Sequence, residues 1–558
     1  MKSLQILFAS VCLFRIPLVA AETAGAKPNI LFIVADDMGF SDAGCFGGEI
    51  HTPNLDQLAA DGLRFTQFYN TGRCWPSRSS LLTGYYAQAI RRDGFSGKGA
   101  PKSEGKTGSG GVRPRWAQLL PVYLQPLGYH SYQSGKWHVD GRPLDNGFEH
   151  SYELDDHNNY FSPARHSEDG QPLPAITPGS KFYTTTFITD QAIKFLKGHA
   201  TTHPGEPFFQ YLAFTSPHFP IHALPEDIAV YQDRYKSGWD AIRAERHARM
   251  KKMGIVDCAL SPLDPKEGGN LTADAREKIG PGEVGEAVPW DSLITEQKEF
   301  QASKMAVHAA MIHRMDIEIG RVLNQIKAMD SLENTMVIFL SDNGATAEQI
   351  VRGSGHDASA PVGSERTFLG IGPGWSSTAN TPFRLHKKWN HEGGIATPLI
   401  VHWPAGIQAH NELRSNPSHL IDLVPTVLEI VGSKPPETVA ELPVPPLHGQ
   451  SLTPAFAKDG EVKHDYLWWN HGGHRAIRIG DWKLVSSSPA WELYDLSTDR
   501  SETKDLAVTY PDKVKAMTQA WTEHAEELHT LSLQDPPDAA RRKKKKGKAA
   551  AQSKAVGQ

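Results

Sequence analysis

The 558-residue sequence predicts an α/β protein: a large, mixed and mostly parallel sheet sandwiched by helices, then a smaller C-terminal α+β domain with a short antiparallel sheet. Short apolar runs alternate with segments of helical periodicity, which is typical of a parallel sheet covered by helices. The apolar runs are 29–35, 208–214, 336–340 and 398–403, and the helical segments are 54–62, 115–127, 187–197, 296–328 and 419–432. Four strand-like segments at hairpin spacing and a helix follow: 465–469, 474–479, 482–486, 491–495 and 511–528.

Single residues support several of these elements. In the segment 29–35, the six apolar residues that follow Asn29 are typical of a strand buried on both faces. Asn54 is expected to cap the helix over 54–62. The helix over 296–328 is predicted from apolar residues at helical spacing, namely Met305, Ala309, Ile312, Ile319, Val322 and Ile326. His308, His313 and Asp316 on this helix are expected on its polar face or behind a site, not as metal ligands.

Two segments show no periodic pattern. Residues 94–111 hold seven glycines in eighteen positions, which predicts a loop. Residues 236–295 are polar and rich in proline and glycine, and we expect an irregular insertion over the surface. The helix at 419–432 ends at Gly432 and prolines follow, which indicates a domain boundary.

The chain is expected to divide into a signal peptide at 1–21, a main domain at 22–435, an α+β subdomain at 436–532 and a basic disordered tail at 533–558. Lys2, the apolar run 4–14 and the small residues 19–21 indicate export, to the periplasm or as a secreted protein. Beyond that segment no stretch is long and apolar enough to predict a membrane span. Three cysteines remain after the signal peptide, and an odd number excludes a pure disulfide framework; whether Cys45 and Cys258 pair stays open.

The charge of the chain is unevenly distributed. The net charge is −5, and residues 541–558 carry eight basic residues and no acid, which leaves −13 on residues 1–540. This acidic balance argues against a nucleic-acid-binding body, because phosphate contacts need a basic face. The tail is either a solvated segment or a contact for an anionic polymer.

Oxygen ligands follow two of the predicted strands. Asp36 and Asp37 end the first strand, and Asp342 and Asn343 follow the run at 336–340. Ligands in open α/β sheets bind beyond the carboxyl ends of strands, and carboxylates with an amide oxygen suit Ca²⁺ or Mg²⁺. Taken singly, both motifs also fit ordinary turns.

Cys74 opens a segment that predicts a helix, with Pro76 in its first turn. A thiol at a helix N-terminus between Arg73 and Arg78 fits a reactive thiolate with a lowered pKa. The other interpretation is a small buried residue.

The segment 74–84 resembles the signature of the sulfatase family, in the alkaline phosphatase superfamily. It reads Cys-Trp-Pro-Ser-Arg and ends in Leu-Leu-Thr-Gly, similar to the family pattern Cys-x-Pro-x-Arg. Further segments resemble family elements in the same order, over about residues 27–530: 29–37, Gly-Lys-Trp-His at 135–138, Ser-Pro-His-Phe-Pro at 216–220, Ser-Asp-Asn-Gly at 341–344 and 381–394 with Glu-Gly-Gly.

This resemblance implies an alkaline-phosphatase-like sulfatase fold and a sulfatase mechanism. Cys74 would be converted to formylglycine by a formylglycine-generating enzyme, and its hydrate would attack the sulfate ester to give a covalent sulfo-enzyme intermediate. A divalent cation, Ca²⁺ in preference to Mg²⁺, would be held by Asp36, Asp37, Cys74, Asp342 and Asn343. Arg78 and Lys136 would orient the hydrate, His218 and Lys387 would bind the sulfate and protonate the leaving oxygen, and His138 would act as the base that releases sulfate.

Some assignments have alternatives. Lys387 and Lys388 are adjacent, and spacing to Glu392 favours Lys387. His222 is either a substrate contact or an ordinary core or surface histidine. The rival functions are a phosphonate or phosphate monoester hydrolase with the same residues, and an inactive protein that binds sulfated glycans. The expected natural substrate is a sulfated saccharide, with aryl sulfates as surrogates.

Overall fold

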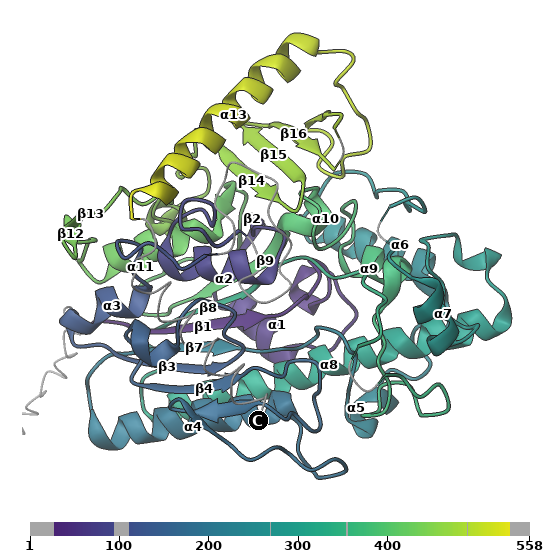
Figure 1. The fold of residues 1–558 in the computed structure, drawn as a ribbon, viewed down its shortest axis with the longest axis horizontal. Coiled ribbons are helices and arrows are strands. Elements are labelled where there is room, and N and C mark those ends of the chain that lie inside the picture. The colour runs from purple at the N-terminus through teal and green to yellow at the C-terminus, as the bar shows by residue number, and fades with distance from the viewer. Residues whose placement is uncertain (1–26, 94–110, 268, 353–354, 488, 536–558) are drawn as a thin grey trace, which may run out of the picture.

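The computed structural model describes residues 27–93, 111–267, 269–352, 355–487 and 489–535 (Figure 1). The predicted signal peptide at 1–21, the glycine-rich segment up to residue 110 and the tail from residue 536 lie outside the described residues.

One mixed sheet forms the centre of the molecule. Within the described residues it has eleven strands, in the order β10 (Glu412–Arg414), β2 (Leu63–Tyr69), β9 (Ala396–His402), β8 (Thr335–Ser341), β1 (Asn29–Ala35), β7 (Phe208–Ala213), β3 (His130–Gly135), β4 (His150–Leu154), β5 (His166–Glu168) and β6 (Gln171–Pro172), with β11 (Ser418–His419) also paired to β2. Strands β8, β1, β7, β3 and β4 are mutually parallel, whereas β9 runs antiparallel to β8 and β2. The predicted mostly parallel, mixed sheet is confirmed.

Helices cover both faces of this sheet. Alternate residues of β1 point to opposite faces, so Leu31 and Ile33 belong to one apolar cluster and Ile30 and Phe32 to the other. The first cluster includes α1 (Pro53–Ala60), α4 (Thr184–Thr202) and α8 (Thr295–Ala328). The second includes α2 (Cys74–Thr83), α3 (Leu120–Leu124), α11 (Leu423–Ile430) and α12 (Thr453–Ala457).

The predicted cap of α1 is wrong. Helix α1 begins at Pro53 after Thr52, so Asn54 lies inside the first turn. The Asn54 amide donates to Asp316 Oδ2 at 2.9 Å, and the same carboxylate accepts the backbone N–H of Leu55 at 2.8 Å. Asp316 of α8 therefore accepts the free backbone N–H groups in the first turn of α1, which is the role expected of Asn54. His308 on the same helix contacts Asp42, at 3.2 Å.

The segment 236–295 is more ordered than its composition predicts. It contains α6 (Gly238–Lys252) and α7 (Ala273–Ile279), and α6 packs against α9 (Gly372–Ala379). The Arg246 side chain on α6 is buried and pairs with Asp42 and Glu49, at 2.7 and 2.8 Å. Burial of α6 thus depends on ion pairs, which an apolar pattern does not reveal.

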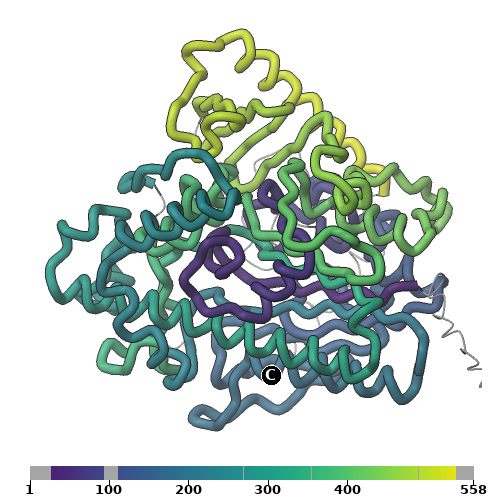
Figure 2. Tube along the Cα trace, turned by 180° about the vertical axis from the view of Figure 1, so that it is seen from behind, coloured from purple at the N-terminus to yellow at the C-terminus, as the bar shows by residue number. Residues whose placement is uncertain are grey.

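The C-terminal part carries the predicted antiparallel sheet. Strands β14 (Leu467–His471), β15 (His474–Ile479), β16 (Trp482–Ser486) and β17 (Glu492–Asp495) pair in sequence order, and α13 (Pro511–Leu533) packs on β15 and β16. This unit projects from the main body in both views (Figures 1 and 2). Helix α13 extends to Leu533, and Asp535 pairs with Arg115 at 3.0 Å, so the body reaches past the expected end at 532.

Two further findings concern the described residues taken together. Cys45, Cys74 and Cys258 are buried free thiols, so Cys45 and Cys258 do not pair. Among the described helices, none combines the length and the apolar character that crossing a membrane requires.

Candidate active site

Four neighbouring parallel strands end at one edge of the main sheet. In the order β8, β1, β7 and β3, the residues that follow them are Asp342 with Asn343, Asp36 with Asp37, His218, and Lys136 with His138. Strand β2 is parallel to β8, because both run antiparallel to β9, so Cys74 after β2 reaches the same edge. The strand-end argument made from sequence therefore holds in space.

Cationic side chains surround the carboxylates of β1. Lys136 Nζ lies 2.5 Å from Asp36 Oδ2, and Lys387 Nζ lies 2.6 Å from Asp37 Oδ1. His218 Nε2 is 3.6 Å from Asp37 Oδ2. All five side chains are buried, which strengthens the two lysine–aspartate ion pairs relative to water.

The residues that follow β8, Asp342 and Asn343, are hydrogen-bonded to Arg78 and Asp37. Arg78 Nε donates to Asp342 Oδ2 at 2.7 Å, and its Nη1 donates to the carbonyl oxygen of Lys136 at 3.2 Å. Asn343 Nδ2 donates to Asp37 Oδ1 at 2.6 Å. Arg78 thus links helix α2 to the ends of β8 and β3.

Three buried oxygens in this group have no hydrogen-bond donor among the described residues: Asp36 Oδ1, Asp37 Oδ2 and Asn343 Oδ1. Ligand atoms of Asp36, Cys74 and Asp342 lie within 4.8 Å of one another, as do those of Asp36, Asp37 and His218. Buried carboxylate and amide oxygens without donors are costly unless a cation binds them. The donor set is rich in hard oxygen ligands, which fits Ca²⁺ or Mg²⁺.

Cys74 is the first residue of α2, after the extended residue Arg73. The helix ends at Gly84, whose φ of 76° is left-handed. Burial raises the pKa of the Cys74 thiol, although Lys136 and Lys387 act to lower it. This direction favours the other interpretation, a small buried residue, because loss of hydration outweighs the neighbouring lysines.

The other polar groups have shifted pKa values as well. Burial lowers the pKa of His138 well below its usual range, and nearby Lys136 adds to that effect. Burial also lowers the pKa of His218 to about 4, against the opposing influence of Asp37. Burial opposes the charge on Lys387, but Asp37, Cys74 and Glu348 together outweigh it and raise the pKa of this lysine.

The backbone around the site is unusually constrained. Asp37, His138 and Lys388 adopt positive φ values of 66°, 54° and 87°. Non-glycine residues in this region cost energy and gather at functional sites. A Cβ on Gly393 would lie 2.2 Å from the carbonyl oxygen of Leu385, so the close approach of the Lys387 loop requires glycine there.

The structure distinguishes Lys387 from Lys388 and shows the surroundings of His222, which the sequence alone did not decide. Lys387 reaches Asp37, whereas Lys388 Nζ pairs with Glu348 at 2.9 Å. His222 is buried, and its Nε2 lies 2.7 Å from the carbonyl oxygen of Thr367, which is the contact of a core histidine.

Sequence reasoning missed His157. Its ring centroid lies 5.0 Å from that of His138 and 5.7 Å from that of His218, so it faces both histidines. It lies in a polar loop after β4, where neither periodicity nor a motif distinguishes it.

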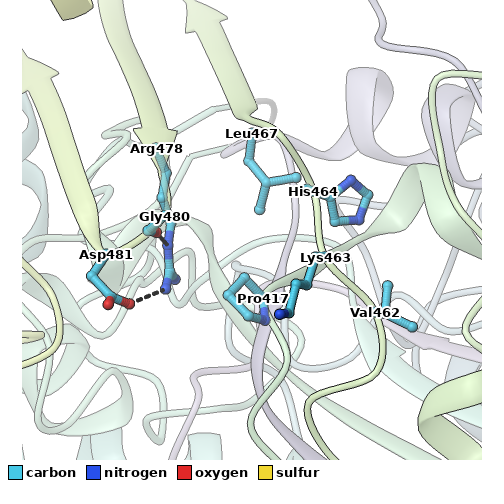
Figure 3. A pocket seen from close by; sticks show the side chains of 8 residues that line it. All are labelled: Pro417, Val462, Lys463, His464, Leu467, Arg478, Gly480 and Asp481. Carbon is cyan, nitrogen blue, oxygen red and sulfur yellow. Dashed lines mark hydrogen bonds and ion pairs between the residues drawn. The ribbon is translucent and has the colours of Figure 1, made fainter.

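A pocket of about 270 Å³ lies elsewhere, beside β14 and the β15–β16 turn (Figure 3). Its lining residues are Pro417, Val462, Lys463, His464, Leu467, Arg478, Gly480 and Asp481. Arg478 is occupied by contacts with Gln67, Tyr69 and the Gly480 carbonyl oxygen, and none of the predicted site residues lines this pocket.

The comparison with known families agrees with this geometry. The sulfatase family model matches residues 28–433, and the model described as N-sulphoglucosamine sulphohydrolase, C-terminal, matches residues 383–531. The chain belongs to the sulfatase family, in the alkaline phosphatase superfamily, and is a sulfuric ester hydrolase.

Several known proteins are similar over most of their length. An uncharacterized sulfatase of Schizosaccharomyces pombe is 32% identical, covering 92% of this chain and 96% of the relative. An arylsulfatase of Klebsiella aerogenes is 30% identical (76% and 91%), and an N-acetylglucosamine-6-O-sulfatase of Bacteroides thetaiotaomicron is 26% identical (88% and 85%). The solved phosphonate monoester hydrolase of Agrobacterium radiobacter shares the fold, with a TM-score of 0.54 at 19% identity over 90% of this chain and 96% of that one.

Proposed function

We propose that this enzyme hydrolyses sulfate monoesters of saccharides, with Cys74 converted to formylglycine and a Ca²⁺ ion held by Asp36, Asp37, Asp342 and Asn343. The observation that carries the proposal is the set of three buried oxygens without donors beside Cys74 at the ends of β1 and β8. A group of buried acids that faces Lys136 and Lys387 suits a site for both a cation and an anionic ester.

A bound cation and a modified residue 74 would supply part of the chemistry. A bound cation would offset the negative charge of the sulfate and of the carboxylates that surround it. Formylglycine, as its hydrate, would supply the oxygen nucleophile that a buried thiol of raised pKa does not provide.

The roles of the chain's own residues follow from their positions. Arg78 is held by Asp342 and Lys136 by Asp36, so both are fixed beside residue 74 and orient it. Lys387 Nζ, beside Asp37 Oδ1, binds the sulfate and carries the proton for the leaving oxygen, together with His218 Nε2, which lies 3.6 Å from Asp37 Oδ2. His138 is uncharged, because burial lowers its pKa, and is therefore able to accept a proton when sulfate leaves.

A saccharide substrate is supported by the relatives rather than by this site. The Bacteroides thetaiotaomicron relative carries the name N-acetylglucosamine-6-O-sulfatase. We further propose that the chain is exported, to the periplasm or as a secreted protein, and matured by a formylglycine-generating enzyme. The basic residues after 540 are proposed to contact anionic polymer.

The test is hydrolysis of matched aryl esters by the matured protein. We expect release of sulfate from aryl sulfates to exceed release from aryl phosphates and phosphonates in kcat/KM, and Cys74→Ala to abolish it while Tm stays unchanged. A preference for the phosphorus esters would contradict the proposal in favour of a phosphonate or phosphate hydrolase. Binding of a sulfated glycan without turnover in a matured sample would favour the inactive binding protein.

A further inference from the structure

Four charged residues form a cluster on the outer side of the proposed active site: Arg73, Glu348, Arg352 and Lys388, called the rim cluster below. Each is near a site residue in the chain: Arg73 precedes Cys74, Lys388 follows Lys387, and the other two lie on the loop after Asn343. The Lys388 side chain is 33% exposed and that of Arg73 15%, whereas those of Lys387 and Asp37 are 1% exposed. The rim cluster therefore lies between the buried site and solvent.

Two of its cations share one carboxylate oxygen. Lys388 Nζ lies 2.9 Å and Arg73 Nη2 lies 3.7 Å from Glu348 Oε1. The other oxygen of Glu348 accepts a hydrogen bond from Thr346 Oγ1 at 3.3 Å. The Arg73 guanidinium also lies 5.1 Å from the ring centroid of Trp75, and its buried Nε has no hydrogen-bond acceptor within the described part of the chain.

Arg352 adds a third cation. Its guanidinium lies 5.4 Å from the ring centroid of Phe219, and that ring stacks on His218 with centroids 4.6 Å apart. Across the described residues, no hydrogen bond or ion pair engages the Arg352 guanidinium. Burial lowers the pKa of Arg352, with Glu348 and Arg73 acting on it in opposite directions, which agrees with a shared location.

The neighbouring histidines add no charge to this cluster. His471 contacts Trp75 with ring centroids 5.4 Å apart, and burial together with Arg73 lowers its pKa to about 3. Burial lowers the pKa of His474 to about 4. Three cations and one carboxylate thus leave an excess of two positive charges beside the site, on a chain whose net charge is −5.

We propose that the rim cluster is a second anion subsite, so that the substrate is a saccharide with a second anionic group, a sulfate or a carboxylate, close to the sulfate that is removed. This inference rests on the proposed function. Arg352 offers a guanidinium fork and Lys388 a compact ammonium, and both bind such anions by charge-assisted hydrogen bonds. A purely structural role explains the pairs of Arg73 and Lys388 with Glu348. Among the described residues, the Arg352 guanidinium has only the contact with the Phe219 ring, so its N–H donors are available to an anion.

The experiment measures the gain in kcat/KM that a second anionic group provides. The probes are phenyl sulfates with a carboxylate at the ortho, meta or para position and their neutral carboxamides. Monosaccharide monosulfates are compared in the same way with disulfates and with sulfated disaccharides that contain a uronate. The variants are Arg352→Gln and Lys388→Gln, and Arg366→Gln is the matched control, since Arg366 is 64% exposed and pairs with Asp357.

We expect at least one dianionic probe to exceed its monoanionic counterpart by about tenfold or more, as charge-assisted hydrogen bonds predict. Arg352→Gln and Lys388→Gln should each reduce that ratio about tenfold, whereas Arg366→Gln should not change it. Preference among sulfate and carboxylate probes identifies the source of the second anion. Equal rates for all pairs, or a ratio that survives both substitutions, would overturn the subsite; if no sulfate ester is hydrolysed at all, the proposed function itself fails.

Discussion

Lys387 and Lys388 show how neighbouring residues of one type acquire different environments. The positive φ of Lys388 turns the chain between them, and the Lys388 N–H donates to the Gly72 carbonyl oxygen at 2.9 Å. Lys387 then reaches the buried Asp37, and Lys388 reaches Glu348 nearer to solvent. At this scale the backbone conformation, more than residue type, decides which lysine reaches the buried carboxylate of Asp37.

Replacement of Lys387 by alanine should reduce kcat for aryl sulfates by about 10²–10⁴-fold, as expected for loss of a general acid. The loss should be greatest for esters with poor leaving groups, because these depend most on protonation of the leaving oxygen. Steady-state kinetics with a series of substituted phenyl sulfates measure this dependence. Lys278→Ala, which removes an exposed lysine paired with Asp274, is the control; an equal loss across the whole series would contradict the proton-donor role.

The sequence predicts these residues unevenly, for physical reasons. Asp36 and Asp37 could be predicted, because they end an apolar strand, and Cys74 because its motif is local. His157 and Glu348 could not, since each lies in an irregular loop and gains its place only through the folding of distant strands. Asn54 was assigned as a cap from its residue type, but Asp316, 262 residues away, occupies that role.

At the scale of elements, the site depends on neighbouring parallel strands that end together. Strands β1 and β8 are in register from Asn29 with Thr335 to Ala35 with Ser341, so the acids that follow them are brought together without any flexible segment. Three of the buried oxygens there lack a hydrogen-bond donor among the described residues, so cation binding would stabilise the folded state by mass action.

Calcium should therefore raise Tm, by several degrees at concentrations far above Kd, and a chelator should reverse the increase. Asp342→Asn should remove most of this response. Thermal unfolding followed with Ca²⁺, with Mg²⁺ and with chelator alone checks this independently of activity. No change in Tm with either cation would contradict the cation site.

The loop before β14 carries a pH-dependent pair. His464 Nε2 lies 2.9 Å from Asp422 Oδ2, and although burial opposes it, Asp422 raises the pKa of His464 above its ordinary value of 6.5. The pair therefore stabilises the folded state fully below that ordinary pKa, and the contribution is lost as pH rises through the folded-state pKa.

Compared with His464→Gln, the wild type should accordingly have a larger advantage in free energy of unfolding at about pH 5.5 than at about pH 8.5. Urea denaturation of both proteins across this pH range gives the difference in free energy of unfolding. The contributions of the buried histidines that both proteins share cancel in this difference. A constant difference between the two proteins would show that His464 does not titrate with folding.

At the scale of the whole molecule, buried ion pairs connect the C-terminal sheet with the segment that follows Lys387. Lys483 on β16 pairs with Glu392, the first residue of α10 (Glu392–Ile395), at 2.9 Å, and with Glu502 at 2.7 Å. All three side chains are buried, and Arg500 also reaches Glu392 at 3.1 Å. The small sheet thus supports the active-site loop through charge, not only through apolar packing.

Lys483→Met should lower the free energy of unfolding by about 3–5 kcal/mol, because it leaves two buried carboxylates with one cation fewer. Lys458→Met removes an exposed lysine, 77% accessible and paired with Glu461, and should leave stability unchanged. Urea denaturation of the two variants and the wild type provides the comparison. Equal stability of Lys483→Met and the wild type would show that this buried network does not fasten the C-terminal sheet.

The sheets of the molecule could be predicted from the sequence better than the buried ion pairs between distant segments. Apolar runs and hairpin spacing led to both sheets, and strands β15 and β16 have the predicted bounds. The helix α6 was missed because its buried face carries Arg243 and Arg246, which an apolar pattern excludes. Buried ion pairs form between distant segments, so local patterns do not reveal them.

The most direct test of the account is mass spectrometry of the tryptic peptide 74–78 from protein that releases sulfate from an aryl ester. The account predicts an aldehyde at residue 74, with the occupancy of the aldehyde rising in proportion to specific activity across preparations. Full activity in a preparation whose peptide carries only the unmodified cysteine would contradict it.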